Sequence, residues 1–141
     1  MKVEKLDEGY YEYLKEVIGG YRGEFEEIIY HVPEIFDLMT KLLNEKLDKK
    51  DKLMISAALG YFVAPIDVIP EKVYGPYGYL DDLYICAYVL TKIQKKYGWS
   101  VLRQNWIGIG DIDKVIPDIL EKSERAVSEK KDEILGYVGL K

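Results

Sequence analysis

The stretch YFVAPIDVIPEKVYGPYGYLDDL, residues 61–83, places three aspartates among apolar side chains and helix-breaking residues. These aspartates are Asp67, Asp81 and Asp82. A carboxylate that leaves water is stable only when a hydrogen bond, a counter-charge or a metal ion compensates it. The three side chains are therefore expected to hold a turn together, to bind a cation or to take part in chemistry.

Two prolines define the turn in this stretch. Pro65 and Pro70 each fix φ and donate no backbone hydrogen bond, so the segment between them is expected to be a rigid turn with Asp67 at its centre. The uncharged run 53–66 precedes the turn, and a second apolar helix is expected at about 79–97. The first run has 14 residues, whereas a membrane span needs about 20. We therefore predict no transmembrane span and a buried central helical hairpin.

The remainder of the chain shows apolar residues at helical spacing and no alternation typical of strands. Ser100 and Asp111 are predicted to cap helices, and Pro117 to mark a helix start or a kink. The expected class is all-α, with residues 1–141 forming one compact bundle of about six to eight helices around the apolar hairpin. The expected helices cover about 6–18, 25–32, 33–47, 48–64, 79–97, 99–106, 112–120 and 124–138.

Composition excludes several classes of protein. The formal charge is −5 with only three arginines, which argues against nucleic-acid binding. The single Cys86 excludes an internal disulfide and is expected to be a small core residue in a reducing compartment. The N-terminal residues do not resemble a secretory signal, so a cytoplasmic location is expected. The excess of Lys and Glu over Asn and Gln is typical of a thermophilic source.

The motif PIDVIP at 65–70 followed by GYLDD at 78–82 resembles the signature of the YkvA-like family, a small helical domain of unknown function. The match covers about residues 50–92. This chain has Glu71 where the family usually has Asp, and its linker 72–77 is one residue longer. The resemblance implies a helical hairpin, no established activity and, in some relatives, a peripheral association with membranes. The signature residues are Tyr61, Pro65, Asp67, Pro70, Gly78, Asp81 and Asp82.

Three interpretations of the aspartates follow. In the structural one, Asp67 locks the turn, while one of Asp81 and Asp82 caps a helix and the other binds a backbone N–H, a tyrosine hydroxyl or a lysine. In the second, all three bind Mg²⁺, Mn²⁺ or Ca²⁺, since these ions prefer oxygen ligands. Neighbours on a helix point about 100° apart, so Asp67 and Asp81 form the better ligand pair. In the third, the same pair performs acid–base catalysis.

Catalysis has the least support, because neither a nucleophile motif nor a phosphate-binding loop accompanies the aspartates and His31 is the only histidine. Tyr74, Tyr77 and Tyr79 beside the hairpin form a predicted docking surface, because tyrosine is enriched at interfaces. The sequence therefore favours a non-catalytic interaction module that contacts an unknown protein partner or a membrane face. The alternative is a metal-binding protein or a small metal-dependent hydrolase that uses the three aspartates.

Overall fold

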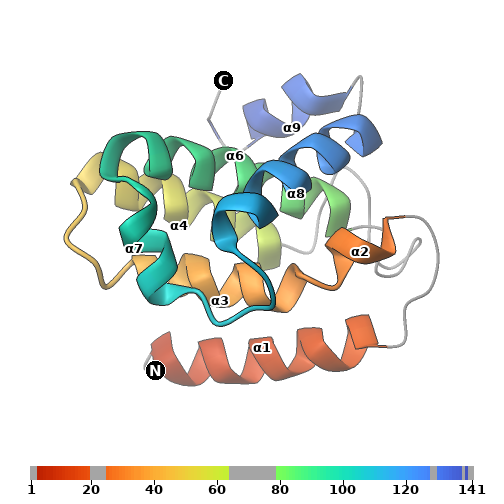
Figure 1. The fold of residues 1–141 in the computed structure, drawn as a ribbon, viewed down its shortest axis with the longest axis horizontal. Helices are drawn as coiled ribbons and strands as arrows, with labels where there is room; N and C mark the ends of the chain where they lie inside the picture. Colours follow the sequence, from red (N-terminus) through yellow and green to blue (C-terminus); the bar gives the residue numbers. More distant parts are fainter. Residues whose placement is uncertain (1–2, 20–24, 64–78, 128–129, 138, 140–141) are drawn as a thin grey trace.

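The computed structural model describes residues 3–19, 25–63, 79–127, 130–137 and 139, and these form an all-α fold (Figure 1). No strand occurs in these ranges, so the predicted fold class is confirmed. The helices are α1 (Val3–Gly19), α2 (Glu26–Ile29), α3 (Val32–Leu42), α4 (Lys49–Val63), α6 (Leu80–Tyr97), α7 (Trp99–Asn105), α8 (Ile112–Val127) and α9 (Lys131–Tyr137).

Helix α6 is the centre of the fold. It packs against α3, α4, α7, α8 and α9, while α1 lies along α3 at the bottom of Figure 1. Its first half has almost no polar surface, because the apolar residues predicted from the sequence are buried on every side of the helix. Gly98, with a φ of 90°, ends α6, and its N–H bonds to the carbonyl of Gln94.

Helix α4 packs against α6, as predicted, but it is not buried on all sides. Ile55, Ala58 and Phe62 face the core, whereas Leu53 is 61% exposed and Ser56 is exposed as well. The helix has one buried and one exposed side even though residues 53–63 carry no charge. Within the described ranges, no helix is both long and apolar enough to span a membrane.

Aromatic rings connect α3, α4 and the start of α6 inside the core. The ring of Phe62 lies 5.5 Å from that of Phe36 and 5.9 Å from that of Tyr79, measured between centroids. Edge-tilted pairs at these separations add to the free energy gained by burying the rings. The end of α4 and the start of α6 are thus joined to α3 through tilted aromatic ring pairs.

Three predicted helix boundaries are wrong. Helix α3 ends at Leu42 instead of continuing to position 47, and a turn follows it. Ser100 is not a cap, because α7 already begins at Trp99 with Gly98 as the preceding residue. Val127 belongs to α8, and the last helix is a separate short segment. The apolar residues keep their helical spacing across these boundaries, so the spacing alone does not predict where each helix ends or begins.

Helix α8 begins directly after Asp111, as predicted. The Asp111 carbonyl accepts the N–H groups of Lys114 and Val115, both at 2.9 Å. Pro117, however, lies inside the helix and is exposed, so it marks no start. Because proline has no backbone N–H, Pro117 donates no helical hydrogen bond to the preceding turn.

Candidate functional site

Two carboxylates of the signature are buried at the start of α6. Asp81 is 0% and Asp82 is 1% exposed. The Tyr61 hydroxyl, from the last turn of α4, donates a 2.8 Å hydrogen bond to Asp81 Oδ2. Asp81 Oδ1 accepts the backbone N–H of Asp82 at 3.0 Å. Asp81 therefore links the end of α4 to the first turn of α6 through a buried hydrogen bond.

This geometry agrees with the structural interpretation of the aspartates. Asp81 binds two of the partners expected of an aspartate that does not cap the helix, a tyrosine hydroxyl and a backbone N–H, while the predicted role of Asp67 lies outside the described residues. The positive end of the helix dipole additionally favours negative charge there. Tyr79 occupies the N-cap position and provides no side-chain cap.

Cys86 lies one turn beyond Asp82 and is completely buried. Burial, and next the nearby charge of Asp82, raise the pKa of the Cys86 thiol well above its ordinary value. The thiol is therefore protonated at neutral pH and unsuited to nucleophilic chemistry. Its predicted position in the core is confirmed.

Much of the predicted site lies outside the described residues: Pro65, Asp67, Pro70, Tyr74, Tyr77 and Gly78. A joint metal site of Asp67, Asp81 and Asp82 stays a prediction; in the part of the chain that is described, no three His, Cys, Asp or Glu side chains converge as a metal site would require. Tyr79 is 4% exposed and packs on Phe62, so its ring belongs to the core and not to a docking surface.

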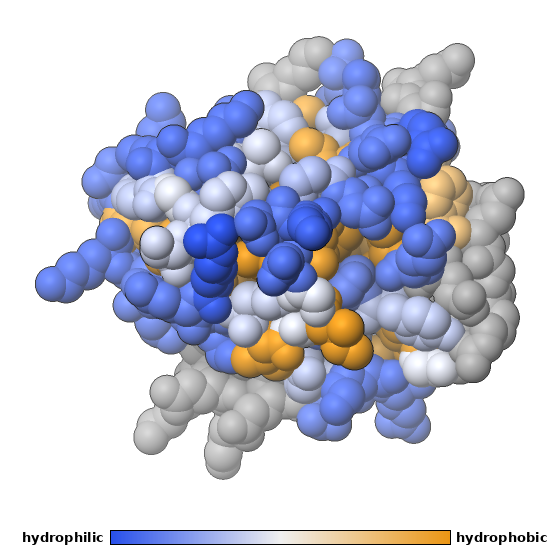
Figure 2. Space-filling model, viewed as in Figure 1, coloured by the Kyte–Doolittle hydropathy of each residue, from blue (hydrophilic) through white to orange (hydrophobic). Residues whose placement is uncertain are grey.

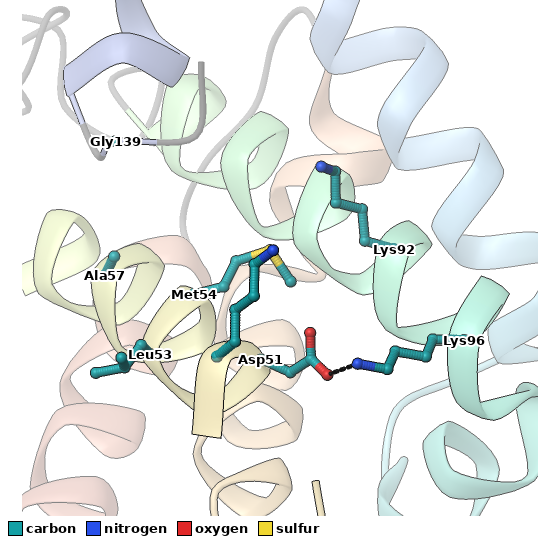
Figure 3. Close-up of a pocket in the computed structure, with 8 residues that line it drawn as sticks. Asp51, Leu53, Met54, Ala57, Lys92, Lys96 and Gly139 are labelled. Carbon is teal, nitrogen blue, oxygen red and sulfur yellow. Dashed lines mark hydrogen bonds and ion pairs between the residues drawn. The ribbon is translucent and has the colours of Figure 1, made fainter. Parts of the chain in front are cut away.

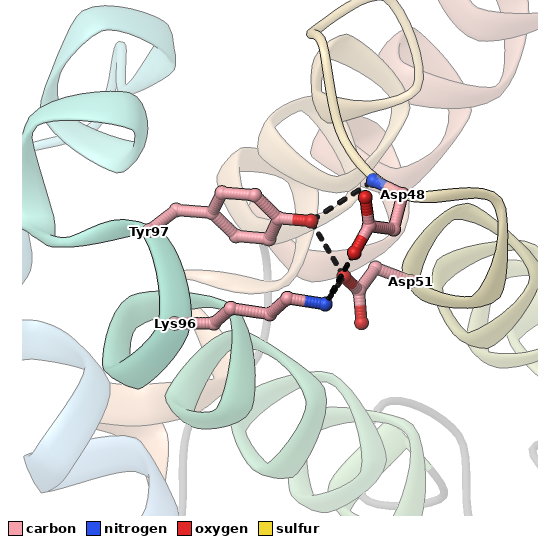
Figure 4. Close-up of polar contacts among 4 residues, drawn as sticks. All are labelled: Asp48, Asp51, Lys96 and Tyr97. Carbon is pink, nitrogen blue, oxygen red and sulfur yellow. Dashed lines mark hydrogen bonds and ion pairs between the residues drawn. The ribbon is translucent and has the colours of Figure 1, made fainter.

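A second polar cluster, which the sequence did not predict, joins the other ends of the same two helices (Figure 4). Lys96 Nζ lies 2.7 Å from Asp48 Oδ2 and 2.8 Å from Asp51 Oδ2. The Tyr97 hydroxyl donates to Asp51 Oδ2 at 2.6 Å and accepts the backbone N–H of Asp48 at 2.9 Å. Polar contacts therefore fasten α4 to α6 at both ends of the helix pair.

Hydrogen bonds determine the electrostatics of this cluster. Those from Lys96 and then Tyr97 lower the pKa of the Asp51 carboxyl below its ordinary value of 3.8. Those to Asp48 and then Asp51 raise the pKa of the Lys96 ammonium above its ordinary value. Both groups are consequently charged over the whole physiological pH range.

We expect Asp51→Asn to weaken the acid dependence of stability. Because the folded-state pKa of Asp51 is depressed, its contribution is present above the ordinary value of 3.8 and is lost as the pH falls through the lower folded value. Urea unfolding from neutral pH to about pH 2 should show part of the wild-type decrease missing in Asp51→Asn. Lys96→Gln, which removes the main donor, should behave in the same way. If the free energy of unfolding fell with pH as much in both variants as in the wild type, Asp51 would not contribute to the acid dependence of stability.

A braced loop, residues 106–110, connects α7 to α8. The indole N–H of Trp106 donates to the Gly110 carbonyl at 2.9 Å, and the N–H of Ile109 donates to Glu34 Oε2 at 3.0 Å. A Cβ at Gly108 would overlap Glu34 Oε2 and the Trp106 ring, so a larger residue would require these side chains to move. Ile107 is 53% and Ile109 84% exposed.

Figure 2 shows apolar surface low on the face where this loop passes in Figure 1. The exposure of this loop was not predicted from the sequence. Ile107 and Ile109, which flank Gly108 in a segment that contains a second glycine, Gly110, were a usable signal of an exposed apolar loop.

Fold and signature together define a small all-α protein built on a helical hairpin with buried aspartates. The family model "Protein of unknown function (DUF1232)" matches residues 51–88, which contain the signature. The uncharacterized protein ORF9 of Methanothermobacter thermautotrophicus is 35% identical over 127 residues, covering 89% of this chain and 87% of that protein. The chain belongs to this YkvA-like DUF1232 family, as its signature predicted.

Two other relatives share only part of the chain. The uncharacterized membrane protein YkvA of Bacillus subtilis is 28% identical over 78 residues, 53% of this chain and 73% of that protein. The E3 ubiquitin-protein ligase RNF170 of Xenopus laevis is 42% identical over 45 residues, 32% of this chain and 18% of that protein. No solved structure matches the chain.

Proposed function

We propose that this protein is a non-catalytic interaction module that docks a protein partner through the braced loop 106–110. One observation carries the proposal: the loop is fixed by hydrogen bonds from Trp106 and to Glu34, yet it holds Ile107 and Ile109 in water. Exposed apolar side chains on a preorganised backbone are typical of binding surfaces, since little conformational entropy is lost when they are buried.

The surroundings of the loop favour a protein over a membrane. Glu34 and Asp111 lie beside it, and the formal charge of the chain is −5, whereas Asp113 is paired with Arg103 at 2.9 Å. Anionic lipid surfaces attract basic segments and repel acidic ones. A partner with an apolar patch and a basic rim fits this loop better.

The test uses the full chain with a photo-crosslinking side chain at position 109, followed by calorimetry with each purified partner that it captures. We expect the double variant Ile107→Ser, Ile109→Ser to weaken binding at least about tenfold, since two central apolar contacts are lost. Leu53→Ser, which removes an exposed apolar side chain elsewhere, is the matched control and should bind like the wild type. Unchanged affinity in the double variant would refute the proposal. Binding to neutral phosphatidylcholine vesicles that depends on the two isoleucines would identify a membrane face instead.

A second candidate function is metal binding by Asp81, Asp82 and Asp67, alone or as part of a small metal-dependent hydrolase. The observation that favours it is the burial of two adjacent carboxylates, 0% and 1% exposed, which supply oxygen ligands of the kind Mg²⁺, Mn²⁺ and Ca²⁺ prefer. A bound ion at 100 times its Kd would stabilise the fold by about 2.7 kcal/mol. Melting temperatures in EDTA and in millimolar metal test this, and equal values would end the candidate.

A further inference from the structure

A pocket of about 660 Å³ lies between the first half of α4 and the second half of α6 (Figure 3). This volume falls within the range of sites that bind small organic molecules, about 300–1,000 Å³. Its floor consists of Leu53, Met54 and Ala57. The pocket is distinct from the buried aspartates at the other end of this helix pair and from the loop 106–110.

The floor of the pocket is apolar surface of α4 that the core does not cover. Leu53 is 61% exposed, while Met54 and Ala57 are half-buried. Positions 53, 54 and 57 share one side of a helix. This is the exposed side of the uncharged run that the sequence predicted to be buried. A ligand with an apolar part would remove it from water.

The charge on the walls is positive. Lys96 and Asp51 face each other in Figure 3 at 2.8 Å, and Lys96 also pairs with Asp48 at 2.7 Å, so this lysine is already compensated by carboxylates. Lys50 and Lys92 also line the pocket. Neither has a carboxylate within ion-pair distance in the described part of the chain, and Lys92 lies 5.1 Å from the ring centroid of Tyr88. Two cations thus remain available in a chain whose formal charge is −5.

The position of Lys50 in the first turn of α4 does not stabilise the helix. Lys49, Lys50 and Lys52 all lie in the first turn of α4, where the helix dipole disfavours cations. An anion bound beside this turn would interact favourably with both the dipole and the lysines. A negatively charged ligand in the pocket would therefore find a favourable environment beside Lys50.

We propose that this pocket binds a free amphipathic anion, a molecule with one alkyl chain that ends in a carboxylate or a phosphate. The anionic head pairs with Lys50 and Lys92, and the chain lies on Leu53, Met54 and Ala57. Charge complementarity selects the head, and the exposed apolar floor selects the tail.

The test titrates decanoate and decyl phosphate into the isotope-labelled full chain and follows backbone amide shifts and heats of binding. We expect saturable shifts at Leu53, Met54 and Ala57, with decylammonium and acetate binding at least about tenfold more weakly, because each lacks one of the two features. The double variant Lys50→Gln, Lys92→Gln should lose about tenfold or more in affinity. Lys95→Gln is the matched control, because Lys95 is exposed on α6 but does not line the pocket.

Three results would overturn the proposal: the absence of saturable shifts at millimolar decanoate, equal binding of decylammonium, or unchanged affinity in the double lysine variant. Lysine-dependent binding to phosphatidylserine vesicles without binding to decanoate would also overturn it, in favour of a lipid surface. Circular dichroism of the variants checks that they remain folded. The loop 106–110 takes no part in this experiment, so its outcome is independent of the proposed protein docking.

Discussion

Asp81→Ala is expected to lower the free energy of unfolding by about 3 kcal/mol. The substitution leaves the Tyr61 hydroxyl without its acceptor at 2.8 Å and the Asp82 N–H without its acceptor at 3.0 Å, both inside the core. It also leaves a cavity, since Asp81 is 0% exposed. Urea unfolding of the wild type and the variant, followed by circular dichroism, measures the difference.

Glu133→Ala is the matched control for this prediction. Glu133 is also an acidic residue in the first turn of a helix, but it is exposed. Its removal should change the free energy of unfolding by less than about 0.5 kcal/mol. Asp81→Asn retains an acceptor oxygen for Tyr61 and should fall between the two. If Asp81→Ala were no more destabilising than Glu133→Ala, the buried hydrogen bonds would not hold the hairpin together.

Phe62→Ala should destabilise the protein by about 4 kcal/mol, because truncating a large buried aromatic side chain is among the most costly core substitutions. Phe62 is 1% exposed and packs between Phe36 of α3 and Tyr79 at the start of α6. Its truncation opens a cavity where three parts of the chain meet, which the surrounding rings cannot fill completely. Thermal and urea unfolding both report the change.

Leu53→Ala on the same helix provides the comparison. Leu53 is 61% exposed, so its truncation should change the free energy of unfolding by less than about 0.5 kcal/mol. Equal losses for the two variants would mean that α4 buries a different face from the one described.

Local sequence signals predicted α6 almost residue for residue. Its expected range was 79–97 and the observed helix is Leu80–Tyr97, because dense apolar residues and Gly98 act over short distances in the chain. A bond from a tyrosine hydroxyl to Asp81 or Asp82 was one of the expected outcomes as well, since a buried carboxylate requires a donor, but the sequence did not identify Tyr61 as that donor. What the sequence did not specify was which of the neighbouring aspartates would receive it.

Tertiary arrangement accounts for most of what was missed. The uncharged run in α4 gives no periodicity that would distinguish its buried side from its exposed side, so Leu53 was assigned to the core. Asp51 and Lys96 meet only because α4 and α6 pack in one particular register, and no motif encodes a contact between residues 45 positions apart. The hydrogen bond from the Ile109 N–H to Glu34 joins residues 75 positions apart, and no sequence motif predicts it either.

A double-mutant cycle between Tyr61→Phe and Asp81→Ala tests the central claim most directly, namely that the signature aspartate Asp81 holds the helical hairpin together. It measures the coupling free energy of the 2.8 Å hydrogen bond from the unfolding of the two single variants, the double variant and the wild type. We predict a coupling of about 1–3 kcal/mol for this buried hydrogen bond. A coupling near zero, with each substitution contributing independently, would contradict it.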